Sequence, residues 1–222
     1  MSNELEPIFR AENAALERVL RRALQKSMLP RQGAEGPFPA PKAGGGPLQI
    51  LDLACGTCRE AGTLVEVFRE FSGPGRDVRF VGADIRDREL KEAAARARAV
   101  AGARDRFEFL TENCAKLGRH RELGHGFDVT FLRHQNYWND QPVWQRIFEQ
   151  GLEKLKDDGL LVITSYFDEE HALALKALER AGAELIITER NEASRQLATP
   201  GKSVDRHVAV FRKKLGKSLV GF

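Results

Sequence analysis

The sequence predicts an α/β protein with a seven-stranded, mostly parallel sheet, helices on both faces, a C-terminal antiparallel hairpin and an N-terminal helical extension. Two observations predict this fold. Short apolar runs typical of buried strands alternate five times with segments of helical periodicity, a pattern that produces parallel strands joined by helices. The last two strand-like segments, 183–189 and 207–211, have no helix between them, so we expect them to pair antiparallel at or near one edge of the sheet.

The elements follow in order along the chain. Apolar side chains recur at helical spacing over 8–29, and a stretch rich in Pro and Gly follows them. We expect the other strands near 48–53, 78–84, 106–110, 127–132 and 159–165, and the other helices near 58–71, 86–101, 115–122, 142–156 and 168–181. The chain is therefore divided into an N-terminal amphipathic helix that acts as a lid or an arm (1–29), a linker (30–47), the α/β core (48–214) and a C-terminal tail (215–222).

Composition bounds the function classes. With 42% hydrophobic and 30% charged residues among 222, the chain is an ordinary globular protein with room for one sizeable domain. A net charge of +3 permits a nucleic-acid partner but does not favour one. No apolar run approaches the roughly 20 residues needed to cross a bilayer, and the N-terminus lacks an apolar secretory core. An odd number of cysteines, three, fits a reducing compartment better than a disulfide framework. We therefore expect a cytoplasmic protein without a membrane partner. No oligomeric state is predicted.

The first strand and the turn after it are the most informative stretch. An apolar run that contains Asp52 breaks into the small-residue segment 54–58 and then into a helical pattern, and the second strand ends in Asp84. Open α/β sheets bind ligands at the carboxyl ends of their strands, where small residues let a ligand approach the backbone. An ionised carboxylate offers two oxygens to the cis-diol of a nucleoside. Either acid alone often caps a helix, but their joint placement favours a nucleoside-bearing cofactor.

Cys55 and Cys58 form a C-x-x-C pair at the start of a helix, which is also where a thioredoxin-like redox pair lies. That alternative is weaker because the chain continues through five alternating units and because Asp84 has no role in thiol exchange. A zinc site is less favoured still, since no second C-x-x-C or Cys/His pair occurs at ligand spacing. We therefore expect no metal site and interpret the small residues as a cofactor turn.

The ordered set of motifs resembles the class I S-adenosylmethionine-dependent methyltransferases. Segment 52–58 is similar to the family's first motif, Asp84 to the acid that binds the ribose hydroxyls, and segments 111–117, 126–132 and 155–163 to the later motifs, so that the resemblance covers 48–213. It implies a Rossmann-like fold and S-adenosylmethionine as cofactor, with S-adenosylhomocysteine as product. It also implies these cofactor-binding residues: Asp52, Ala54, Cys55, Gly56, Cys58, Asp84, Ile85, Asn113, Cys114 and Leu132. The chain departs from the family pattern at Cys58, where a third glycine is common, and at Asn113, where Asp is usual.

The acceptor side is expected in the loop that follows the fourth strand, 133–140, at the same edge of the sheet. His134 can take a proton from an oxygen or nitrogen nucleophile, or merely pack against the cofactor. Aromatic side chains there stack on a flat substrate or cover the core. The predicted catalytic residues are His134 and Tyr137, and the predicted substrate-binding residues are Arg133, Asn136, Trp138 and Tyr166. The basic loop 190–206 lies at this edge too, and we interpret it as solvated in preference to a rim for an anionic substrate.

The expected activity is transfer of a methyl group to a nitrogen or oxygen of a small-molecule acceptor by in-line displacement, largely through proximity and exclusion of water. Two alternatives stay open. One is an RNA or protein methyltransferase, which needs a wide, basic rim; the other is a non-catalytic member of the fold that acts as a partner subunit. The absence of an apparent metal-ligand set in the sequence argues against a magnesium-dependent, catechol-type mechanism.

Overall fold

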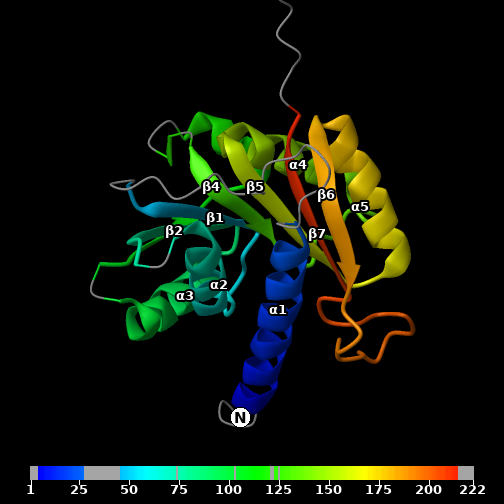
Figure 1. Cartoon of the computed structure of the whole chain (residues 1–222), viewed down its shortest axis with the longest axis horizontal. Coiled ribbons are helices and arrows are strands. Elements are labelled where there is room, and N and C mark those ends of the chain that lie inside the picture. The colour runs from blue at the N-terminus through cyan, green and yellow to red at the C-terminus, as the bar shows by residue number, and fades with distance from the viewer. Residues whose placement is uncertain are drawn as a thin grey trace, which may run out of the picture.

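The computed structural model describes residues 5–27, 46–73, 75–102, 104–120, 123–124 and 126–214. Seven strands form one sheet in the order β3-β2-β1-β4-β5-β7-β6 (Figure 1). The strands are β1 (Leu48–Leu53), β2 (Val78–Asp84), β3 (Arg106–Thr111), β4 (Phe127–Leu132), β5 (Leu155–Ser165), β6 (Ala183–Arg190) and β7 (His207–Lys213). The helices are α1 (Glu6–Ser27), α2 (Ala61–Ser72), α3 (Asp87–Val100), α4 (Gln141–Lys154), α5 (Asp168–Arg180) and the short 3₁₀ helix η1 (Cys114–Arg119). None of the helices in the described ranges is long and apolar enough to cross a membrane.

The sheet is parallel from β3 through β5, and β7 runs antiparallel between β5 and β6. This confirms the predicted fold class, including the C-terminal hairpin. The strand order reverses beside β1, whose neighbours are β2 on one side and β4 on the other. Loops that leave adjacent strands in opposite directions at such a switch point open a crevice at the carboxyl ends of the strands. The fold therefore positions a site after β1, β2 and β4.

Alternate residues of each strand enter two separate cores. Ile50 packs with α1, α2 and α3 on one face of the sheet, whereas the next residue, Leu51, packs with α4 and α5 on the other. Both side chains are fully buried. Strands covered on both faces read as near-continuous apolar runs. That is why the four central strands could be located from the sequence.

The N-terminal helix α1 belongs to the first of these cores. Its apolar stripe is buried against α2, β6 and β7: Leu16, Val19, Leu20, Ala23 and Leu24. Lys26 pairs with Glu189 of β6 at 2.8 Å, which fixes the C-terminal end of the helix. The first turns of α1 extend to the end of the sheet where the loop between β6 and β7 lies (Figure 1). One half of α1 is therefore a core element, and the other half overhangs the crevice. The expected linker, apart from residues 46–47, and the tail lie outside the described residues.

Two boundaries differ from expectation. β5 begins at Leu155, directly after α4, so the segment 157–159, typical of a turn, lies within the strand. A Cβ on Gly159 would lie 2.9 Å from the carbonyl oxygen of Phe127, so glycine alone permits this close approach of β5 to β4. The expected third helix of the core is only η1, because the backbone amide of Gly118 donates to the side chain of Gln150 in α4 and the helix does not continue.

Candidate active site

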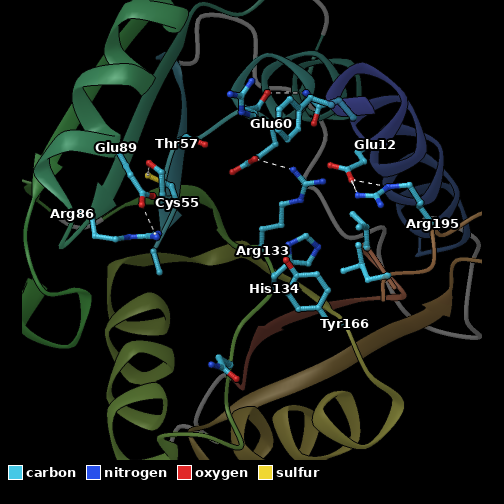
Figure 2. Close-up of a pocket in the computed structure, with 18 of the residues that line it drawn as sticks. Glu12, Cys55, Thr57, Glu60, Arg86, Glu89, Arg133, His134, Tyr166 and Arg195 are labelled. Atoms are coloured by element: carbon cyan, nitrogen blue, oxygen red, sulfur yellow. Dashed lines mark hydrogen bonds and ion pairs between the residues drawn. The ribbon is translucent and has the colours of Figure 1, made fainter. Parts of the chain in front are cut away.

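A cavity of about 650 Å³ lies at the carboxyl ends of the strands, where the switch point places the crevice (Figure 2). Its walls come from the turn after β1, the start of α3, the loop after β4, the end of β5, the first half of α1 and the loop between β6 and β7. Of the predicted cofactor-binding residues, Ala54, Cys55 and Gly56 line this cavity directly.

The turn after β1 exposes backbone groups to the cavity and is tied to the end of β2. Ala54 and Gly56 both have positive φ angles, 55° and 54°. The amide of Cys55 donates to the carbonyl oxygen of Ala83 at 3.2 Å, and that of Gly56 donates to Oδ2 of Asp84 at 2.8 Å. The φ angle of Gly56 favours glycine, and a Cβ there would lie 2.8 Å from Nη2 of Arg86, so a larger residue would be strained and would displace the guanidinium.

Asp84 is buried behind the cavity lining, and the lining residue Arg86 covers it. The Arg86 guanidinium donates to both carboxylate oxygens, at 2.9 and 3.2 Å, and also pairs with Glu89 at 2.8 Å. Burial raises the pKa of Asp84, but the hydrogen bonds from Arg86 and Gly56 lower it by more than burial raises it. The net shift is below the usual value, so the carboxyl group is ionised. Ile85, the next residue, is 66% exposed and leaves an apolar surface beside the acid.

The remaining predicted cofactor residues support the turn from beneath and do not line the cavity. Asp52 and Cys58 are buried against each other, with Cys58 Sγ 3.3 Å from Oδ2 of Asp52. Cys114 accepts from the amide of Ala54 at 3.3 Å and is buried. The side chain of Asn113 caps η1 by accepting from the amide of Ala115, and Leu132 is fully buried in the core beneath α4 and α5.

A buried ion-pair network, absent from the sequence-based prediction, forms the floor on the acceptor side. Arg133 binds Asp205 at 2.7 and 3.1 Å. It also binds Glu60 at 2.9 Å (Figure 2). Burial lowers the pKa of Arg133 and raises that of Asp205, but their mutual attraction outweighs this and keeps both charged. Since two carboxylates already engage its guanidinium, Arg133 positions its neighbours. Asp205 lies 72 residues away in sequence, and no local motif marks it.

His134 lies on this network and lines the cavity with Asn136 and Tyr166. Its Nε2 is 2.8 Å from Oδ1 of Asp205 and 3.1 Å from the backbone amide nitrogen of the same residue, and its ring stacks on Tyr166 with centroids 3.9 Å apart. The backbone of His134 has a φ of 57°, which turns the chain sharply at the end of β4. The structure thus brings together His134, Asn136 and Tyr166, as the sequence-based prediction has them.

Tyr137, predicted to be catalytic, and Trp138, predicted to bind substrate, are not in the described lining of the cavity. Tyr137 is 3% exposed, stacks on Phe148 of α4 and accepts a hydrogen bond from Arg180 at 3.3 Å. Trp138 packs against Phe167, with ring centroids 4.7 Å apart. Helix α4 packs beneath this loop and draws Tyr137 into the core. Trp144, from α4 itself, lines the cavity instead.

The rim joins α1 to the loop between β6 and β7. Arg195 donates to Glu12 from its Nε at 3.0 Å, across the mouth of the cavity (Figure 2). Arg59 lies over the ring of Phe9, 3.8 Å from its centroid. Arg206 pairs with Asp168 at 2.6 Å, away from the cavity lining. Two of the basic side chains in loop 190–206 are thus already paired with carboxylates, so the loop is not a free basic rim.

Comparison with known proteins agrees with this geometry. A family model described as "Methyltransferase domain" matches residues 46–206. An N-methyltransferase from Bradyrhizobium japonicum WM9 is similar in structure, with a TM-score of 0.57 and 15% identity over 91% of this chain and 98% of that one. A magnesium protoporphyrin IX methyltransferase from Synechocystis PCC 6803 with bound S-adenosylmethionine has a TM-score of 0.55 and 15% identity over 76% and 71%.

An rRNA methylase from Streptococcus thermophilus has a TM-score of 0.54 and 11% identity over 90% of this chain and 95% of that one. At such identities the structural likeness concerns the fold alone. No curated protein sequence matches the chain.

Proposed function

The chain belongs to the class I S-adenosylmethionine-dependent methyltransferase family, and on that premise we propose that it methylates a nitrogen or oxygen of a small-molecule acceptor. The observation that carries the proposal is the cavity itself. One wall is the Ala54–Gly56 turn beside ionised Asp84, and the opposite wall carries His134, Asn136 and Tyr166. A cofactor wall and a wall of polar and aromatic side chains thus border one cleft.

The residues on the cofactor wall fit S-adenosylmethionine. Gly56 has no side chain and so lets the methionine part approach the turn, and the Asp84 carboxylate can accept from both ribose hydroxyls once the half-exposed Arg86 guanidinium swings away. The exposed Ile85 offers an apolar contact for the adenine ring. When bound, the cofactor supplies an electrophilic methyl group on a positively charged sulfur.

The acceptor wall can orient a nucleophile and remove its proton. Asp205 holds the His134 ring through Nε2, and Tyr166 stacks on one face of that ring, so the imidazole has a fixed orientation at the cavity wall. We assign proton acceptance from the attacking oxygen or nitrogen to Nδ1 of His134, in the tautomer whose Nε2–H donates to the Asp205 carboxylate, and orientation of the acceptor to Asn136 and Tyr166. Arg133 and Glu60 keep the Asp205 carboxylate in place.

The size of the cavity supports a small acceptor. A volume of about 650 Å³ falls in the range of pockets for small ligands, roughly 300–1,000 Å³. The Glu12–Arg195 pair and the Phe9–Arg59 contact bring α1 over the mouth. An RNA or protein substrate would require these contacts to open, and Arg195, a cation at the mouth, is already paired.

The test begins with calorimetric titration of the purified chain with S-adenosylmethionine and S-adenosylhomocysteine, for which we expect micromolar binding. Transfer of a labelled methyl group to a fraction of cell metabolites below a few kilodaltons, compared with total RNA and with protein, then identifies the acceptor class. Label in the small-molecule fraction, lost in His134→Ala, supports the proposal. Label in RNA or protein alone would overturn the small-molecule assignment, and absence of cofactor binding by well-folded chain would overturn the catalytic reading.

A further inference from the structure

Three side chains that could ligate a metal ion converge beneath the cofactor turn. A carboxylate oxygen of Asp52 and the sulfur atoms of Cys55 and Cys58 all lie within 4.8 Å of one another. Asp52 comes from the penultimate position of β1, whereas both cysteines come from the turn after it. The sequence has no second C-x-x-C or Cys/His pair at ligand spacing, and the third side chain of this group is a strand carboxylate, which zinc motifs do not mark.

One of the two carboxyl oxygens of Asp52 is buried without a hydrogen-bond partner among the described residues. The residue is fully buried, Oδ2 faces the thiol of Cys58 at 3.3 Å, and Oδ1 has no hydrogen-bond partner among the described residues. An unsatisfied buried carboxyl oxygen costs free energy. Burial and the neighbouring carboxylate of Glu60 both raise the pKa of Asp52, and the guanidinium of Arg133 is engaged by Glu60 and Asp205. A cation beneath the turn would satisfy Oδ1 once the carboxyl group gives up its proton.

The backbone at Cys58 is consistent with a use for its side chain. Its φ angle is 47°, a conformation that glycine adopts without strain and that other residues rarely adopt. Cys58 adopts this conformation at a conformational cost that glycine would not incur. Its thiol points toward Asp52 and Cys55.

We propose that Asp52, Cys55 and Cys58 bind a zinc ion that clamps the cofactor turn to the end of β1. Two thiolates and one carboxylate suit Zn²⁺, which prefers tetrahedral sites of sulfur, nitrogen and oxygen ligands. Binding releases the protons of both thiols and of the Asp52 carboxyl, and Glu60 or a water molecule fills the fourth position. The inner side of the turn holds the ion, while the backbone of Ala54 and Gly56 stays open to the cavity. The site adds a structural ion to the proposed function and does not depend on it.

The test uses Co²⁺ as a spectroscopic probe on the full chain, reduced and freed of metal with a chelator. We expect a thiolate-to-cobalt charge-transfer band in the near ultraviolet and intense visible bands of tetrahedral Co²⁺ at one equivalent. Zn²⁺ is expected to displace the probe and bleach these bands, since it binds such sites more tightly. Zn²⁺ should also raise the melting temperature, because a ligand that binds only the folded state stabilises it.

Cys58→Gly is the decisive variant, because glycine suits the local φ angle and the chain should fold at least as well. Loss of an outer-shell partner already weakens metal affinity by about 10- to 100-fold, so loss of this ligand should weaken it by at least about 100-fold. Asp52→Asn should do the same with little change in shape.

Cys114→Ala is the matched control, since Cys114 is equally buried beside the turn but lies outside the three-residue group, and it should keep the cobalt spectrum. Absence of the charge-transfer band in the reduced wild-type chain would overturn the proposal. Equal cobalt spectra in the wild type, Cys58→Gly and Asp52→Asn would do so too, because the ion would then bind elsewhere.

Discussion

Replacement of Asp84 by Asn tests the cofactor wall. The carboxylate accepts from the amides of Gly56 and Arg86 at 2.8 and 2.9 Å and from the Arg86 guanidinium at 2.9 and 3.2 Å. Bound ribose must take over the guanidinium bonds, whereas the two amide bonds can persist. Since a hydrogen bond to a charged group contributes about 1.5–3 kcal/mol, the loss of the charge should weaken S-adenosylmethionine binding by about 10- to 150-fold.

Calorimetric titration of both chains measures this difference directly, and a thermal melt of each shows whether the variant is folded. Asp87→Asn is the matched control, because that carboxylate is exposed, pairs with Lys91 and Thr111 and lies outside the cavity lining. The control should bind like the wild type. Equal affinity of a folded Asp84→Asn chain would show that the ribose does not bind there, and the assignment of this wall would be wrong.

Three further predictions follow from the same geometry. Arg86→Gln should tighten cofactor binding by up to about fivefold, because the Arg86 guanidinium that competes for Asp84 is half exposed and screened by water, so that the pair contributes at most about 1 kcal/mol; weaker binding in the titration would show that Arg86 holds the cofactor. Asp205→Ala should lower the free energy of unfolding by about 3–5 kcal/mol in urea titrations, since it removes one partner of buried Arg133; a loss below about 1 kcal/mol would mean that the network relaxes without cost. Burial raises the pKa of Glu170 from 4.5 to about 7, so between these pH values the folded chain keeps a proton that the unfolded chain loses. The resulting stabilisation is complete below about pH 4.5, and the free energy of unfolding should decline by about 3 kcal/mol as the pH rises to about 7. Urea titrations should show this decline in the wild type and not in Glu170→Gln.

The cofactor turn and the fold were predictable because their signals are local. A strand covered on both faces needs an apolar run, and a turn that approaches a ligand needs small residues, so β1 and Gly56 can be located within one stretch of sequence. The alternation of such units predicted the parallel sheet, and the missing helix before β7 predicted the antiparallel strand. The boundary of β5 could not be predicted in this way, because it depends on how closely Gly159 approaches β4.

The acceptor wall was only partly predictable, because side-chain direction in a loop depends on what packs against it. His134 and Tyr137 stand three residues apart in one loop, yet the first faces the cavity and the second stacks on Phe148. The packing of α4 decides between them. Asp205 and Arg133 show the same limit over a longer distance, since the pair forms only when β7 inserts beside β5.

The sequence by itself thus determined the order of strands and helices, the class of cofactor and the position of its turn, because each depends on residues within one strand–turn–helix unit. Only the tertiary structure decided which loop side chains reach the cavity, that Arg86 covers Asp84, that α1 is half core and half rim, and that Asp52 meets the two cysteines of the turn. These features arise from contacts between elements, and packing sets such contacts through distances and directions that spacing along the chain does not encode.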